Sequence, residues 1–363
     1  MMTKLRIYFK RLVILAVSLV LLVVGFGFWF FSLFPNSEQR IDLSKTLPSQ
    51  IAYISNGVKE SRGKILAVVT SSAQMGASGK KTGYELTELA RAYYVFTANG
   101  FNVDIASPLG GTPPIVIDGD DMGRFDFAFL NDHTAQNKVN NSIKLSEVAP
   151  EQYQAVYFVG GKGAMFDFPD DPNIKSIVRN IFQRNKVVGA VCHGPAALVD
   201  IVLDDGTNLL QNKQISSFTN EEELFLIPDA EQIFPFLLQD KLTEQGANFV
   251  AGPAYLETIS QEENLITGQN PWSVWKLAEA MVKQLGYEPM DREITDEEHS
   301  VDILLTYQNE GYDEAKIHVE SLIDGEKILF NRTLLAMHSL VAIMQFEIGE
   351  AIDLMSLLAF AKR

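Results

Sequence analysis

The hydrophobic residues of this chain follow patterns that divide it into an apolar N-terminal stretch, a central body and a C-terminal extension. Residues 12–34 are uncharged and rich in Leu, Val and Phe, whereas between residues 63 and 286 short apolar runs alternate with longer amphipathic segments. Short runs rich in β-branched residues predict buried strands, and helical spacing of apolar residues predicts helices. Their alternation predicts a doubly wound, mainly parallel α/β sheet with sites at the carboxyl ends of its strands.

The elements expected in the body follow from this pattern. Strands are predicted at residues 64–70, 103–106, 153–159, 187–191, 215–219, 248–250 and 265–267. Helices are predicted at residues 84–99, 174–183 and 273–285. Residues 35–62 are expected to form a polar linker, in which Ile51–Ile54 is a candidate for an added strand.

The N-terminal stretch Leu12–Phe34 is long enough to cross a bilayer, because about 20 apolar residues span its hydrocarbon core. It exceeds the roughly 7–15 apolar residues of a cleavable signal, and no small-residue cleavage pattern follows it. The tail of residues 1–11 carries Lys4, Arg6, Lys10 and Arg11. The positive-inside rule therefore predicts a single-pass anchor in the cytoplasmic membrane, with the tail in the cytoplasm and the body on the periplasmic or extracellular face. The alternative is a signal that is removed.

The C-terminal extension, residues 287–363, has a different pattern from the body. Residues 288–299 are acidic and predict a linker, residues 301–307 predict a strand, and residues 313–322 and 334–360 predict helices. We expect a small α-rich appendage that packs on the body or makes a homodimer. Docking of this appendage on the membrane surface is the alternative.

Composition excludes several kinds of partner. The net charge of −16 would repel nucleic acid and anionic lipid. A single cysteine excludes an intrachain disulfide, so the fold depends on packing. Cysteine and histidine do not occur at zinc-like spacing, and we expect no metal or other cofactor.

The single cysteine, Cys192, directly follows the apolar run Val187–Val191, and Gly194 and Pro195 after it predict a turn and the start of a helix. Such an elbow lifts the side chain out of the sheet and offers the next backbone N–H to an oxyanion. A helix N-terminus also lowers the pKa of a thiol from its free value of about 8.5. The sequence therefore predicts that Cys192 is a nucleophile rather than a small core residue.

This elbow and four further segments resemble the ThiJ/PfpI superfamily, which has the flavodoxin-like fold of the class I glutamine amidotransferases. The matching segments lie in order along the body and are Lys81–Gly83 with Glu88, Ala106–Gly111, Gly160–Asp167, Ala190–Pro195, and Phe218–Glu223 with Thr267–Pro271. Within the superfamily the pattern is most similar to the branch of stress chaperones and glutathione-independent glyoxalases.

The resemblance implies roles for residues around the cysteine. It makes Glu88 the group that hydrogen-bonds the thiol and carries protons, and burial beside a sulfur would raise the pKa of that carboxyl. It makes His193 an acid–base residue held by a carboxylate, either Glu222 or Glu223. Adjacent side chains on a tight turn diverge, so His193 need not take the thiol proton directly. Without the resemblance, these carboxylates would be solvated residues in the first turns of helices.

The glycine-rich segment after the strand at residues 153–159 is a candidate for substrate binding. The N–H of Gly161 can pair with that of His193 as an oxyanion hole, and Lys162 and Gly163 follow it. The glyoxalase branch that the chain resembles carries histidine where this chain has Lys162, so substrate preference is expected to differ. His133 lies in a poorly matched insertion, residues 112–150.

Three classes of function are consistent with these residues. The first is a cofactor-free lyase that converts a 2-oxoaldehyde such as methylglyoxal to lactate, in which Cys192 adds to the aldehyde and Glu88 moves a proton between the two carbons. The second is a cysteine hydrolase that acts on an amide or peptide, and the third is a stress chaperone or redox sensor. The resemblance favours the lyase.

Overall fold

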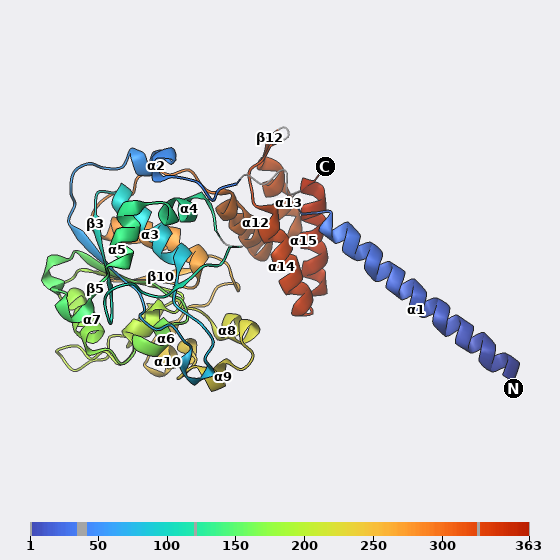
Figure 1. Ribbon diagram of the computed structural model, residues 1–363, viewed down its shortest axis with the longest axis horizontal. Coiled ribbons are helices and arrows are strands. Elements are labelled where there is room, and N and C mark those ends of the chain that lie inside the picture. Colours follow the sequence, from blue (N-terminus) through green and yellow to red (C-terminus); the bar gives the residue numbers. More distant parts are fainter. Residues whose placement is uncertain (1, 35–41, 120–121, 325–326, 363) are drawn as a thin grey trace. The chain divides into compact units, whose positions relative to one another are not determined.

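The computed structural model describes residues 2–34, 42–119, 122–324 and 327–362. The chain divides into two compact units, one formed by Asp42–Ile294 and the other by Met1–Ile41 together with Thr295–Arg363. The first unit contains the predicted sheet, and the second is largely helical (Figure 1).

The central sheet of the first unit has seven strands. In spatial order they are β10 (Ile259–Glu262), β11 (Leu265–Gly268), β7 (Val187–Val191), β6 (Ala155–Phe158), β1 (Lys64–Val68), β3 (Asn102–Ser107) and β5 (Ile143–Lys144). All neighbours are parallel except β10 and β11, which form an antiparallel pair at one edge. The predicted, mainly parallel α/β sheet is therefore confirmed.

Two predicted strands lie outside this sheet. The segments at 215–219 and 248–250 contribute only β8 (Gln214–Ile215) and β9 (Asn248–Phe249), which pair with each other. Another short parallel pair joins β2 (Tyr84–Glu85) to β4 (Ile115–Val116). The edge strand β10 was not predicted, because its sequence Ile-Ser-Gln-Glu contains a single apolar residue.

Helices surround the sheet of this unit. They are α2 (Ala52–Ser55), α3 (Leu86–Ala98), α4 (Arg124–Leu130), α5 (His133–Asn140), α6 (Ala164–Asp167), α7 (Pro172–Gln183), α8 (Asn220–Leu226), α9 (Ala230–Ile233), α10 (Leu238–Glu244) and α11 (Val274–Gln284). The predicted strand at Ile51–Ile54 is wrong, because most of this segment lies in α2, which packs against α3.

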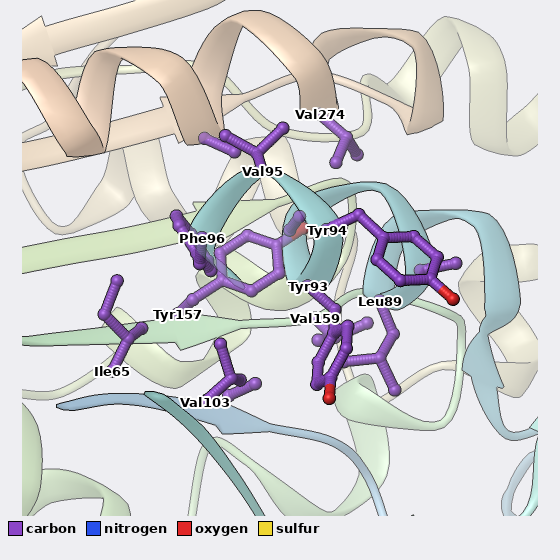
Figure 2. Packing of buried hydrophobic residues seen from close by; sticks show 14 of the residues in the cluster. Ile65, Leu89, Tyr93, Tyr94, Val95, Phe96, Val103, Tyr157, Val159 and Val274 are labelled. Atoms are coloured by element: carbon purple, nitrogen blue, oxygen red, sulfur yellow. The ribbon is translucent and has the colours of Figure 1, made fainter. Parts of the chain in front are cut away.

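Side chains of the central strands alternate between two buried clusters. Ile65 and Ala67 of β1 belong to the cluster that includes α3 and α11, whereas Leu66 and Val68 belong to the cluster that includes α7. Figure 2 shows the first cluster, where Tyr157 from β6 lies among residues of α3. Complete burial of one aliphatic side chain contributes about 1.5–3 kcal/mol, so strands buried on both faces hold their carboxyl ends firmly in place.

The second unit contains α1 (Met2–Phe31) and the C-terminal extension from Thr295 onward, whereas residues 287–294 belong to the first unit. The extension consists of α12 (Asp296–Glu310), α13 (Tyr312–Ser321), the short strands β12 (Ile323–Asp324) and β13 (Lys327–Ile328), α14 (Arg332–Met344) and α15 (Ile348–Ala361). The predicted strand at residues 301–307 is wrong: a capping box at Thr295 starts a helix that continues through it. The single helix predicted at 334–360 is two, separated near Phe346, whose φ is +64°.

The N-terminal helix α1 includes the segment Lys10–Phe31, which is 22 residues long and has a hydropathy of 2.7, and its most apolar stretch of 18 residues is not buried. Its length and composition suffice to cross a membrane, although a signal sequence would have the same properties. Part of the predicted linker, residues 35–41, lies outside the described residues.

Candidate active site

Cys192 lies at the carboxyl end of β7, in the interior of the sheet. Its backbone N–H donates to Gly268 O (2.9 Å), and its carbonyl accepts from Phe218 N (3.0 Å). These bonds hold it at a φ of +57°, a left-handed conformation that costs a non-glycine residue on the order of 1–3 kcal/mol. Gly194 is required by the same turn, because a Cβ there would lie 2.3 Å from Phe158 O. The fold thus holds this cysteine in a strained elbow.

The helix after this elbow differs from the prediction. Gly194–Leu198 forms a 3-10 helix of five residues instead of the start of an α-helix. So short a helix has little dipole to lower the pKa of a thiol. Burial, and then the neighbouring charge of Glu88, instead raise the pKa of Cys192 well above its usual value. The thiol therefore needs a base to remove its proton.

Glu88 lies in the first turn of α3 and is completely buried. Its Oε2 accepts a hydrogen bond from Gly160 N (2.6 Å), and it lies close enough to Cys192 that each group shifts the pKa of the other. A Cβ on Gly160 would lie 2.5 Å from Glu88 Oε2 and 2.8 Å from Cys192 Cβ, so only glycine leaves room for this approach. Burial, and then the charge of Glu85, raise the pKa of Glu88 well above its usual value, which favours the protonated carboxyl.

His193 connects the cysteine to a carboxylate. Its Nδ1 lies 3.2 Å from Cys192 Sγ, and its Nε2 lies 2.5 Å from Glu223 Oε2. Burial acts to raise the pKa of Glu223, but the charge and hydrogen bond of His193 outweigh it and the pKa is lowered. An ionised Glu223 accepts the proton of Nε2–H, which leaves the lone pair of Nδ1 facing the thiol. The expected divergence of Cys192 and His193 is therefore not observed.

The choice between the two neighbouring glutamates is resolved by their hydrogen bonds. Glu222 does not face His193, because its Oε2 caps α8 by accepting from the backbone N–H and hydroxyl of Thr219. Its Oε1 accepts from Tyr255 N (2.7 Å), Gln269 Nε2 (3.1 Å) and Asn270 Nδ2 (3.0 Å). Glu222 therefore fixes the start of α8 and the segments that flank the site, and Glu223 is the partner of His193.

Two backbone N–H groups are free to bind an oxyanion. Within the described residues, neither Gly161 N nor His193 N donates a hydrogen bond to the chain. Gly161 has a φ of +95°, and a Cβ on it would lie 2.4 Å from Gly83 O. Gly163 also has no room for a side chain, since a Cβ added to it would lie 2.6 Å from Thr70 Cγ2. The glycines of this loop thus allow its backbone to pack tightly beside the site.

Aromatic rings enclose the histidine. The ring centroids of His193 and Phe218 lie 4.7 Å apart, and the ring of Phe234 stacks on His193 at 6.3 Å. Phe166 in turn stacks on Phe234. The sequence analysis assigned no role to these rings, and only the position of Phe218 and Phe166 inside motif segments pointed to the site. They exclude water from one side of His193 and so strengthen its hydrogen bonds.

A buried ion pair behind Glu88 was also missed. Arg91 and Asp126, each with a side chain 2% exposed, are 3.3 Å apart, and Arg91 Nη1 donates to Pro271 O. The charge of Arg91 acts to lower the pKa of Glu88, against the larger effect of burial. An arginine three residues after Glu88 in an otherwise apolar helix was the available signal.

Other candidates lie elsewhere or make no site. His133 is exposed at the start of α5. His299, His318 and His338 belong to the C-terminal extension. Among the residues that the structure describes, no group of three or more His, Cys, Asp or Glu side chains is arranged to hold a metal ion.

Comparisons with known proteins agree with this fold. The model of the DJ-1/PfpI family matches residues 80–284. A glutathione-independent glyoxalase of Schizosaccharomyces pombe is 30% identical over 236 residues, which cover 62% of this chain and 98% of that protein. Among solved structures, Rapid Encystment Protein 24 KDa of Francisella tularensis is 36% identical with a TM-score of 0.58, covering 62% of this chain and 100% of that one. Glyoxalase III of Candida albicans is 26% identical with a TM-score of 0.55, covering 61% and 97%.

Proposed function

The chain belongs to the DJ-1/PfpI family, and from that premise we propose that it converts a 2-oxoaldehyde such as methylglyoxal to a 2-hydroxy acid such as lactate, with Cys192 as nucleophile and without glutathione. One observation carries the proposal: two separate proton-handling groups approach the same sulfur. His193, oriented by Glu223, faces it at 3.2 Å, and the protonated carboxyl of Glu88 lies beside it.

The first step is addition of the thiol to the aldehyde. His193 Nδ1 takes the thiol proton, the sulfur forms a bond to the aldehyde carbon, and the electrons of the C=O bond move to oxygen. The N–H groups of Gly161 and His193 stabilise that oxygen until Glu88 protonates it. The product is a hemithioacetal, with Glu88 ionised and His193 positively charged.

The next steps move a proton from one carbon to the other. Ionised Glu88 removes the proton from the carbon bonded to sulfur, while His193 protonates the neighbouring carbonyl oxygen. Glu88 then returns its proton to the second carbon, and His193 takes the hydroxyl proton of the first carbon, which becomes a thioester. Water adds its oxygen to the thioester carbon and gives a proton to Glu88, the C–S bond breaks, and His193 returns its proton to the sulfur, which restores all three groups. The sum is one 2-oxoaldehyde plus one water to one 2-hydroxy acid, with no external oxidant or reductant.

A cysteine hydrolase is the second candidate. Cys192, His193 and Glu223 by themselves provide a nucleophile, a base and a group that orients the base. Such an enzyme has no use for a protonated carboxyl against the sulfur, and Glu88 therefore favours the lyase. A redox sensor is disfavoured, because such cysteines are exposed and have a low pKa, whereas Cys192 is 5% exposed and its pKa is raised.

The direct test uses the full chain purified in detergent. Incubated with methylglyoxal and no glutathione, it should form lactate, while a panel of amides should remain intact. Amide cleavage without lactate would transfer the assignment to the hydrolase. Absence of both activities would contradict the enzymatic proposal.

We further propose that α1 is retained as a single-pass membrane anchor, with the family domain outside the cytoplasmic membrane. The apolar segment Lys10–Phe31 and the basic residues before it support this orientation. Contacts at its end support retention: an Arg332 guanidinium N–H donates to Leu33 O, and Lys362 Nζ donates to Ser32 O (2.5 Å). A signal sequence that is removed would have no such partners in the mature protein.

A further inference from the structure

Lys162 is a cation at the edge of the candidate active site. It is half-buried in the turn between Gly161 and Gly163, and its Nζ lies 5.8 Å from the centroid of the Phe218 ring. That ring packs on His193. The ammonium group therefore lies beside an aromatic ring that packs on His193, the residue next to the nucleophile.

This ammonium group forms no ion pair and no hydrogen bond in the described part of the chain. No carboxylate lies within 4.0 Å of Nζ, and Nζ donates no hydrogen bond. Glu223 uses Oε2 for His193, and its buried Oε1 makes no hydrogen bond. The positive charge nevertheless acts to lower the pKa of both Cys192 and Glu223, which places it within electrostatic reach of the reacting groups.

We propose that Lys162 selects 2-oxoaldehydes that carry a negatively charged group, such as a phosphate, next to the dicarbonyl unit. The inference deepens the proposed function and rests on it. The transient oxyanion of the reaction already has donors at Gly161 N and His193 N. A permanent anion on the substrate needs a permanent cation, and Lys162 is the only one among the groups that lower the pKa of Cys192 and Glu223, since His193 is charged only after it takes a proton. The reaction balances as before: R–CO–CHO and water give R–CHOH–COO⁻ and a proton, and R keeps its charge.

The first test measures local charge at the sulfur and needs no turnover. Cys192 is the only cysteine, so alkylation of the full chain reports on this sulfur alone. Iodoacetate carries a negative charge and iodoacetamide does not, and the ratio of their rates cancels any change in thiolate fraction. We expect Lys162→Met to lower the iodoacetate/iodoacetamide ratio about tenfold and Lys162→Arg to preserve it. Lys283→Met, at an exposed position of α11, is the matched control and should leave it unchanged.

The second test compares two substrates with one carbon skeleton, hydroxypyruvaldehyde phosphate and neutral hydroxypyruvaldehyde. For Lys162→Met we expect kcat/KM to fall about tenfold or more for the phosphate ester, because the charge that attracts the phosphate is removed. A tenfold loss corresponds to about 1.4 kcal/mol. For the neutral compound we expect a loss of less than about threefold. Equal losses for both, or an unchanged alkylation ratio, would overturn the proposal. If the wild type turns over neither compound nor methylglyoxal, the proposed function itself fails; turnover without a preference for the anion means that only the role of Lys162 is wrong.

Discussion

Replacing Glu88 with glutamine should slow the enzyme while making its fold more stable at neutral pH. The glutamine would keep the size of the side chain and an oxygen that accepts from Gly160 N, but it could not transfer a proton. A positioned general acid or base contributes about 10²- to 10⁴-fold to a rate. We therefore expect methylglyoxal turnover to fall by that factor, while iodoacetamide still alkylates Cys192.

The effect on stability follows from the direction of the pKa shift. Glu88 has an ordinary pKa of 4.5 that burial raises in the folded protein, so below about pH 4.5 both folded and unfolded chains hold the proton. Above that pH the unfolded chain loses its proton while the folded chain keeps it. Glu88 therefore contributes a decrease of about 1.4 kcal/mol per pH unit to the free energy of unfolding of the wild type, until the raised pKa is reached. Glutamine does not ionise in either state and lacks this loss.

The assay is thermal unfolding of the full chain in detergent between pH 5 and pH 8, beside lactate formation at each pH. The melting temperature of Glu88→Gln should exceed that of the wild type by a margin that grows with pH, at roughly 2–4 °C per kcal/mol for a domain of this size. Glu151→Gln removes an exposed carboxylate and should change neither quantity. Turnover of Glu88→Gln within a factor of a few would refute the lyase mechanism, and a constant temperature difference would refute the assigned protonation state.

Three further outcomes are expected. Cys192→Ala should abolish turnover and leave the melting temperature nearly unchanged; retained activity would contradict every enzymatic assignment made here. Glu223→Gln should reduce turnover about 10²-fold or more, because His193 would lose the carboxylate that orients it. Glu222→Gln should mainly lower the melting temperature, because Glu222 anchors α8 and its flanking segments. A larger loss of turnover in Glu222→Gln than in Glu223→Gln would show that the two glutamates were assigned wrongly. The protein should remain in the membrane fraction after a salt wash, and a tag placed after Arg363 should be reachable from outside. A soluble protein that has been shortened near residue 35 would show that α1 is a cleaved signal.

The sheet could be predicted from the sequence because its central strands are buried on both faces. Val187–Val191 is apolar throughout and coincides with β7. The errors occur where apolar content and periodicity disagree. In α12, which covers residues 301–307, the buried positions are Ser300, Val301, Ile303 and Leu304, two pairs that are three residues apart, as on one face of a helix. The break after Met344 depends on a left-handed residue, Phe346, for which no glycine or proline gives a signal.

The candidate site shows a different limit of sequence reasoning. Residue types and order, with the family resemblance, pointed to Cys192, His193 and either Glu222 or Glu223, but the direction of each side chain depends on backbone angles. One available signal was not used. Thr219 and Glu222 have the Thr-x-x-Glu spacing of a capping box, which commits Glu222 to the helix start and leaves Glu223 for His193.

The features that destabilise this unit converge on one sulfur. Cys192 has a strained φ, Glu88 is a buried acid, and Gly160 and Gly161 give up side-chain packing so that backbone and carboxyl can approach. None of them improves packing, and a core selected only for stability would have an apolar residue in place of Glu88 and an unstrained backbone at residue 192. They persist because the surrounding strands are buried on both faces and can bear costs on the order of 1–3 kcal/mol each. The same convergence predicts which substitutions will separate stability from activity: those that remove strain or a buried proton at this sulfur, as in Glu88→Gln, should strengthen the fold and weaken the enzyme.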